Sequence, residues 1–168
     1  VAVLREVAGF PVPWIARETT SVPVRTEDLT FTVPGPVGER QVRARLYLPV
    51  GRPNAPAMVI LHGIHYLGID EPRLMGFARA MASCGIRVLT PELPGIKDYH
   101  VDEDSVATIG KSVQWMAKRS GGPVGVMGLS FAGGLALVAA EDPLYAPGFK
   151  FVFAVGAQDS IARVTAYY

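Results

Sequence analysis

The stretch PVGVMGLSFAGGLALVA, residues 123–139, constrains the fold more than any other part of the sequence. It begins with a short apolar run, as expected of a strand that is buried on both faces of a sheet. One polar residue, Ser130, interrupts it, and small apolar residues suited to a buried helix follow. A buried strand that turns directly into a helix is typical of β-α-β units with a parallel sheet. The sequence therefore predicts such a sheet, with Ser130 at the carboxyl end of one strand.

Other segments repeat this alternation of strands and helices. We expect further buried strands at residues 57–63, 86–94 and 150–157. We expect one helix capped by Asp70 and ended by Gly85, and a second over 101–122. Ahead of these, the alternating segments 28–33 and 41–49 predict a hairpin of half-exposed strands. The predicted fold class is α/β, with a mainly parallel sheet and an N-terminal antiparallel hairpin.

Composition sets the domain count and excludes some classes of function. The chain has 168 residues, the size of one domain, and a formal net charge of +1. We interpret the proline-rich residues 1–26 as an arm or linker and residues 27–168 as the α/β core. The balanced charge gives no electrostatic basis for binding nucleic acid or an anionic membrane. No apolar run approaches the roughly 20 residues that a membrane-spanning helix needs.

Two single residues bear on processing and redox chemistry. The sequence starts at Val1, so a signal peptide or anchor removed upstream is one interpretation. The location is therefore open between the cytoplasm and a membrane-tethered or exported form. The single cysteine, Cys84, has no partner for an intrachain disulfide, and we expect it in the core.

Ser130 has the neighbours that a strained serine requires. Gly128 lies two positions before it and Ala132 two positions after, which gives G-x-S-x-A, close to the G-x-S-x-G nucleophile elbow. Both positions crowd the adjacent strand and helix, so only Gly, or Ala at some cost, has a small enough side chain. The alternative is that the Ser130 hydroxyl simply caps the helix that follows.

With these features on one chain, the sequence resembles the α/β-hydrolase superfamily over about residues 27–160. The resemblance rests on three pieces in the family's order: an apolar strand ending in His62-Gly63, the loop PELPG, and GLSFAGG. It implies that Ser130 is the nucleophile of a serine hydrolase acting on carboxylic esters, thioesters or related acyl groups. It also implies an oxyanion hole made by the backbone N–H groups of Ile64 and Phe131.

The same resemblance assigns roles to the residues around these. His62 and Gly63 would shape the loop that follows their strand, as Gly128 and Ala132 would shape the elbow. His65 and Tyr66 would line the substrate pocket. We expect a small acyl substrate, no nucleic-acid partner, no cofactor and no metal.

A hydrolase of this superfamily needs a base that this sequence does not place where expected. The family's chain order is Ser, then Asp or Glu, then His, but all three histidines of this chain precede Ser130. The resemblance also implies a sheet cut short after about its sixth strand. We therefore expect the acid and the histidine in a missing C-terminal segment or a partner chain, and no activity from this chain alone.

Two other interpretations stay open from the sequence. One is a hydrolase-fold fragment without catalysis, kept for binding. The other is a dinucleotide-binding domain, because GLSFAG also reads as G-x-S-x-x-G and Asp159 follows the next strand. The second interpretation lacks the middle glycine that lets the backbone approach a pyrophosphate.

Overall fold

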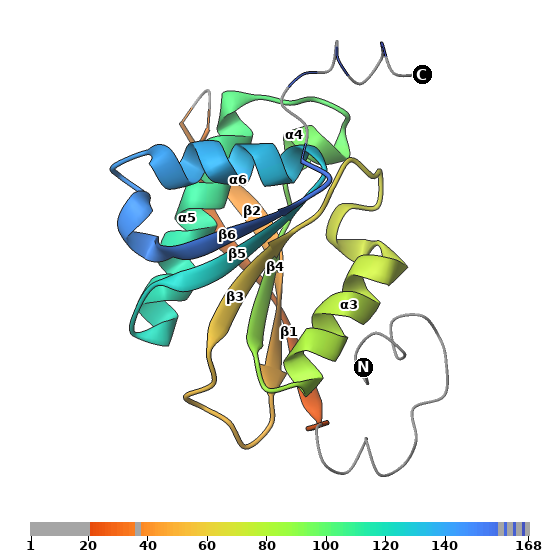
Figure 1. The fold of residues 1–168 in the computed structure, drawn as a ribbon, viewed down its shortest axis with the longest axis vertical. Coiled ribbons are helices and arrows are strands. Elements are labelled where there is room, and N and C mark those ends of the chain that lie inside the picture. The colour runs from red at the N-terminus through yellow and green to blue at the C-terminus, as the bar shows by residue number, and fades with distance from the viewer. Residues whose placement is uncertain (1–20, 36–37, 158–159, 161–162, 164–165, 167–168) are drawn as a thin grey trace.

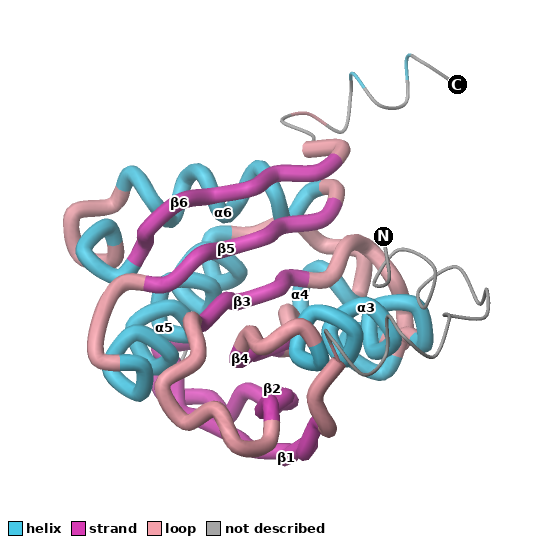
Figure 2. Tube along the Cα trace, turned by 60° about the horizontal axis from the view of Figure 1, so that its bottom comes forward, coloured by secondary structure: helices cyan, strands magenta, loops and turns pink. Residues whose placement is uncertain are grey.

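The sheet has its strands in the order β1-β2-β4-β3-β5-β6 (Figures 1 and 2). The structure is a computed structural model that describes residues 21–35, 38–157, 160, 163 and 166. The strands are β1 (Val24–Gly35), β2 (Gly38–Pro49), β3 (Ala57–Leu61), β4 (Arg87–Pro91), β5 (Val124–Leu129) and β6 (Phe149–Val155). β1 therefore begins inside the range 1–26, and both hairpin strands extend beyond the predicted segments.

The strand directions confirm the predicted fold class. β1 and β2 form an antiparallel hairpin, and β2 joins the rest of the sheet by antiparallel pairing with β4. The pairs β3–β4, β3–β5 and β5–β6 are all parallel. β4 and β5 are buried over almost their whole length, because helices cover both faces at the centre of the sheet.

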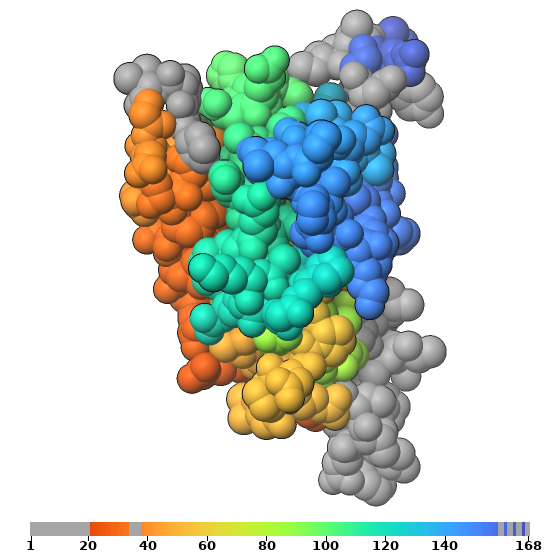
Figure 3. All heavy atoms as spheres, turned by 90° about the vertical axis from the view of Figure 1, so that its left-hand side faces the viewer, coloured from red at the N-terminus to blue at the C-terminus, as the bar shows by residue number. Residues whose placement is uncertain are grey.

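The helices form a layer on each side of the sheet (Figure 1). α3 (Pro72–Ser83) lies on one side, and α5 (Glu103–Ser120) and α6 (Phe131–Glu141) lie on the other. Figure 3 looks onto the α5 and α6 side, with the β1–β2 hairpin in orange along its edge. The short helix α4 (Pro94–Lys97) follows β4, and two 3-10 turns, η1 (Gly68–Asp70) and η2 (Ala146–Gly148), complete the elements.

α5 illustrates why the sequence forms a helix at this position. The Asp102 side chain accepts a hydrogen bond from the Ser105 N–H and caps the start of the helix. Gly121 ends it in the left-handed conformation at φ 77°, which costs glycine little. Acidic residues occupy the first turn and basic residues the last, in the order that the helix dipole favours. These features confirm the helix predicted over 101–122.

Two hydrophobic clusters hold the layers together. The larger cluster joins α5 and α6 to the sheet and includes the hairpin, where the Phe31 ring stacks on Trp115 at 6.1 Å between centroids. The smaller cluster joins α3 to the other face through Ile60, Leu74 and Met127. Because each sheet face has its own cluster, the carboxyl ends of the parallel strands are fixed from both sides.

The edge strand β6 is covered on one face only. On the face toward α6, β6 packs closely on the helix: a Cβ added at Gly133 of α6 would lie 3.2 Å from the Cβ of Ala154. On the other face, Phe151, Phe153 and Val155 are 49%, 56% and 38% exposed. Their partners on β5 are Gly125, Met127 and Leu129, of which Gly125 and Met127 are buried, so the exposed apolar face belongs mainly to β6.

Two local expectations are corrected by the structure. Glu71, and not Asp70, caps α3, and it accepts a hydrogen bond from the Leu74 N–H at 2.8 Å. Asp70 instead pairs with arginines of β2, because η1 turns its side chain toward the sheet. Cys84 is exposed and not in the core, because it lies at the end of α3 where the chain turns away from the sheet. Among the described residues, no helix combines the length and hydropathy needed to cross a membrane.

Two glycines give a direct test of this packing. A Cβ at Gly110 in α5 would overlap the Tyr145 ring, whereas one at Gly76 in α3 would meet nothing within 4 Å. We predict that Gly110→Ala lowers the free energy of unfolding by about 1–3 kcal/mol through overpacking. Gly76→Ala should raise it by about 0.5–1 kcal/mol, because alanine favours a helix. Urea denaturation measures both, and equal effects would contradict the packing of η2 on α5.

Candidate active site

Ser130 lies in a strained turn between β5 and α6. Its backbone has φ 55° and ψ −132°, a conformation that L residues rarely adopt. The turn is fixed from both sides, because the Ser130 N–H donates to the Val155 oxygen and the Gly133 N–H donates to the Ser130 oxygen, each at 2.9 Å. The Ser130 hydroxyl makes no capping hydrogen bond to α6. The alternative of a simple helix cap is therefore wrong.

The small residues around Ser130 are required by close backbone contacts. A Cβ at Gly128 would lie 2.5 Å from the Gly133 Cα and 2.7 Å from the Ala132 oxygen. Ala132 is fully buried in the core beneath the turn. β5 and α6 thus approach each other so closely that no larger side chain fits at Gly128.

The loop after β3 lies directly against this turn. A Cβ at Gly63 would be 3.3 Å from the Ser130 Cβ and 3.4 Å from the Leu129 oxygen. Neither the Ile64 N–H nor the Phe131 N–H donates to any of the described residues. Phe131 is the first residue of α6, where the backbone N–H groups have no partner within the helix. Both predicted oxyanion donors therefore lack a partner among the described residues.

His62 holds the loop and is not free to act as a base. The side chain is buried, and its Nε2 accepts a hydrogen bond from the Leu93 N–H at 2.9 Å. Its Nδ1 lies 2.9 Å from the Gly63 oxygen, so the proton is on Nδ1 and the ring is neutral. Burial lowers the pKa of His62, and the hydrogen bond to Gly63 only partly offsets this. The ring ties the loop after β3 to the loop after β4.

An ion pair between buried Glu92 and half-buried Lys97, which the sequence did not reveal, supports the same loop. Glu92 is only 4% exposed, and its Oε1 lies 2.7 Å from the Lys97 Nζ of α4. A Cβ at Gly68 would lie 2.6 Å from this carboxylate, so Gly68 leaves room for it beneath the loop. Glu92 belongs to the PELPG loop, one of the three pieces on which the family resemblance rests. No pattern in the sequence predicts that Glu92 pairs with Lys97 of α4.

His65 and Tyr66 differ in their surroundings. His65 lines a cavity of about 440 Å³ together with Ile64, residues of α3 and the end of β5. Tyr66 does not line this cavity; its ring is 64% exposed and stacks on His65 at 4.9 Å between centroids. The His65 Nδ1 accepts a hydrogen bond from the Leu67 N–H at 3.2 Å. Contact of either residue with a substrate stays a prediction.

No described group activates Ser130. Its hydroxyl has no hydrogen-bond partner within 21–35 and 38–157 or at residues 160, 163 and 166. Each histidine instead interacts with the backbone. His62 interacts with Gly63 and Leu93, and His65 accepts a hydrogen bond from the Leu67 N–H. The His100 Nδ1 lies 2.8 Å from the Asp98 backbone oxygen. Within the described part of the chain, no three His, Cys, Asp or Glu side chains gather in a way that could hold a metal. Asp159, on which the dinucleotide interpretation depends, lies outside the described residues.

Comparison with solved structures identifies the fold. Over 82% of the chain it matches the esterase Est22 with a TM-score of 0.69 and 16% identity. Over 97% it matches brefeldin A esterase, a bacterial homologue of human hormone-sensitive lipase, with a TM-score of 0.67 and 20% identity. Over 75% it matches a hyperthermophilic esterase from the archaeon Pyrobaculum calidifontis, with a TM-score of 0.54 and 26% identity.

The chain has the α/β-hydrolase fold. It spans 45%, 52% and 41% of the lengths of these three esterases, in the order given. No protein-family model matches the sequence, and no curated protein matches it either. That the turn at Ser130 is a nucleophile elbow stays a prediction.

The close contact at Gly128 predicts a large cost for one methyl group. Gly128→Ala should lower the free energy of unfolding by at least about 1–3 kcal/mol, because its Cβ would meet backbone that cannot move aside. Gly122→Ala is the matched control, since a Cβ there meets nothing within 4 Å. Thermal and urea denaturation compare the two variants. Equal stability of both would show that β5 and α6 are not in such close contact.

The burial of neutral His62 predicts a dependence of stability on pH. The pKa of His62 is lowered in the folded state, so below about 6.5 the unfolded chain takes up the proton first. Its stabilising effect is complete above pH 6.5 and declines as the pH falls toward the folded-state pKa. Urea midpoints measured from pH 8 to pH 5 should fall for the native chain. His62→Gln should flatten this part of the profile; an unchanged slope would contradict a buried neutral ring.

Proposed function

We propose that the protein containing this chain is a carboxylic ester hydrolase that uses Ser130 as its nucleophile. The observation that carries this proposal is the strained Ser130 backbone, at φ 55° and ψ −132°, pressed against the Gly63 loop. Such strain persists only where the surrounding structure enforces it, and it is concentrated at functional sites. The three matched structures are those of esterases, which favours ester hydrolysis over the dinucleotide-binding alternative.

The free backbone donors support an acyl-enzyme mechanism. The Ser130 oxygen would attack the ester carbonyl and form a tetrahedral intermediate with a negatively charged oxygen. The N–H groups of Ile64 and Phe131 have no partner among the described residues and would stabilise that charge. The bond to the alcohol then breaks to leave an acyl group on Ser130, and water releases the acid. Thioesters would follow the same steps.

The base and its supporting acid would come from another segment or a partner chain. None of His62, His65 and His100 hydrogen-bonds to Ser130, and His62 is fixed by bonds at both nitrogens. The exposed apolar side chains of Phe151, Phe153 and Val155 support such a companion, because apolar side chains that lie together on a surface often mark an interaction site. A segment packed there would cover the edge strand nearest to Ser130 and bring an Asp or Glu and a His to it.

Labelling with a fluorophosphonate tests the nucleophile. In the intact protein, Ser130 should react covalently, and Ser130→Ala should abolish both labelling and hydrolysis of p-nitrophenyl butyrate. The expected loss in kcat is at least about 10,000-fold. Ser21→Ala removes an exposed hydroxyl far from the elbow in sequence and should leave both unchanged. Labelling that survives Ser130→Ala would show that another residue is the nucleophile.

The same assay on residues 1–168 alone tests the source of the base. We expect no hydrolysis at an enzymatic rate, since no described histidine reaches Ser130. Adding the segment or chain that carries the acid and histidine should restore turnover. If the chain alone is a soluble monomer with Ser130-dependent activity that His65→Ala leaves intact, a base from another segment is wrong. Absence of activity in every form would instead favour the non-catalytic alternative.

A further inference from the structure

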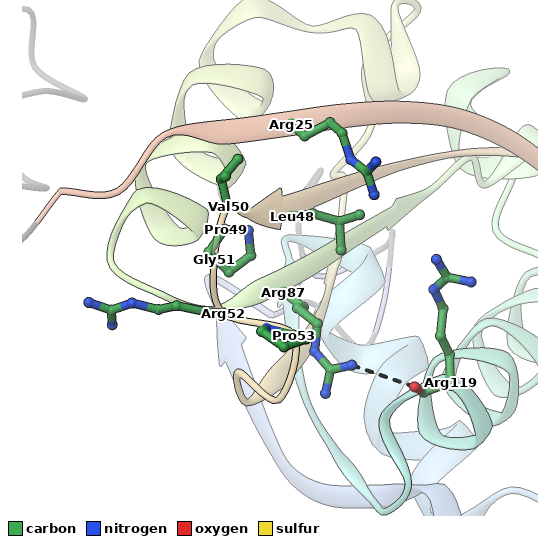
Figure 4. A pocket seen from close by; sticks show the side chains of 9 residues that line it. All are labelled: Arg25, Leu48, Pro49, Val50, Gly51, Arg52, Pro53, Arg87 and Arg119. Carbon is green, nitrogen blue, oxygen red and sulfur yellow. Dashed lines mark hydrogen bonds between the residues drawn. The ribbon is translucent and has the colours of Figure 1, made fainter.

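A cavity lies at the opposite end of the parallel strands from Ser130. It has a volume of about 580 Å³ and is lined by four arginines and by residues 48–53 (Figure 4). Arg25 is near the start of β1, Arg87 begins β4, and Arg119 is in the last turn of α5. Because β2 runs antiparallel to β4, its end lies beside the amino ends of the parallel strands. Ser130 follows the carboxyl end of β5.

Three guanidinium groups face this cavity. In Figure 4 those of Arg25, Arg87 and Arg119 point into one space, whereas Arg52 extends away from it. Two hydrogen bonds to backbone oxygens hold Arg87 in this position. Its Nε donates to the Ala55 oxygen at 2.7 Å, and its Nη1 donates to the Arg119 oxygen at 3.5 Å. The remaining donors of Arg87 are left for a ligand.

Negative charge is scarce around these groups. Arg25 pairs with Glu27 at 2.7 Å, but neither Arg87 nor Arg119 has a carboxylate partner among the described residues. Within the part of the chain that the structure describes, no acidic side chain lines the cavity. Burial lowers the pKa of Arg87, and the charge of Arg119 lowers it further. Positive charges that lie close together in a partly buried cavity repel each other, and a bound anion would offset this repulsion.

Part of the cavity lining is apolar. Leu48, Pro49, Val50 and Pro53 contribute to it from the end of β2 and the turn that follows. Arginines beside apolar side chains match a molecule that has an anionic end and a compact apolar part. Guanidinium forks bind phosphate oxygens in pairs, so a phosphate matches three of them better than a single carboxylate.

We propose that this cavity binds a small phosphate monoester with an apolar substituent. The phosphate would lie between Arg25, Arg87 and Arg119, and the substituent would pack on Leu48 and Val50. The site is separate from Ser130 and does not depend on the proposed hydrolase activity.

Phenyl phosphate is a suitable probe, titrated by calorimetry into the full chain at low and at moderate salt. We expect saturable binding that is tighter than for inorganic phosphate and weakens with salt. Arg119→Gln should weaken the Kd about ten- to hundredfold, because it removes a charge-assisted contact of an exposed side chain without disturbing the core. Val50→Ser should weaken phenyl phosphate but leave inorganic phosphate unchanged. Arg79→Gln, which removes an exposed charge on α3, is the control and should bind as the native chain does.

Several outcomes would overturn the proposal. One is an absence of saturable binding, and another is an unchanged Kd for phenyl phosphate in Arg119→Gln. A third is an equal loss of affinity in Arg79→Gln, which would indicate only a general attraction to positive charge. Binding to vesicles of phosphatidylglycerol and phosphatidylcholine without binding to phenyl phosphate would assign the arginines to a membrane surface instead. None of these readouts involves ester hydrolysis, so failure here and failure of the proposed function are distinguishable.

Discussion

The contact between β5 and α6 is the constraint on which the rest of the site depends. Gly128 and Gly133 let the strand and the helix approach so closely that the residue between them must adopt φ 55°. That residue is Ser130, and its half-buried position at the carboxyl edge of the sheet follows from the turn and not from any side-chain bond among the described residues. The parallel sheet, the helix layers on both faces and the hydrogen bond from Ser130 to Val155 all keep this turn from relaxing.

Buried or half-buried polar groups hold the loop after β3, which lies opposite Ser130. Neutral His62 joins the loops after β3 and β4, and the Glu92–Lys97 pair lies beneath the same loop at Gly68. Burying such groups is unfavourable unless they are well paired, so they add more to the definite shape of the loop than to overall stability. In our account, that definite shape keeps the free N–H groups of Ile64 and Phe131 ready for a negatively charged oxygen.

The sequence predicted those parts of the structure that depend on local patterns. The buried strands, the hairpin, α5 with its caps and the position of Ser130 follow from periodicity and from glycines at fixed spacings. It could not predict contacts between distant segments. Glu71 replaced Asp70 as the cap of α3 because Arg43 and Arg45 of β2 bind Asp70, and the arginine cavity unites three separate elements.

A crystal structure of the intact protein after reaction with a phosphonate ester tests the central claim most directly. The account predicts a covalent bond between phosphorus and the Ser130 oxygen, with Ser130 still at positive φ. One phosphonyl oxygen should lie about 3 Å from both the Ile64 and the Phe131 nitrogen atoms. An adduct on another residue, or an oxygen that points away from the loop after β3, would contradict it.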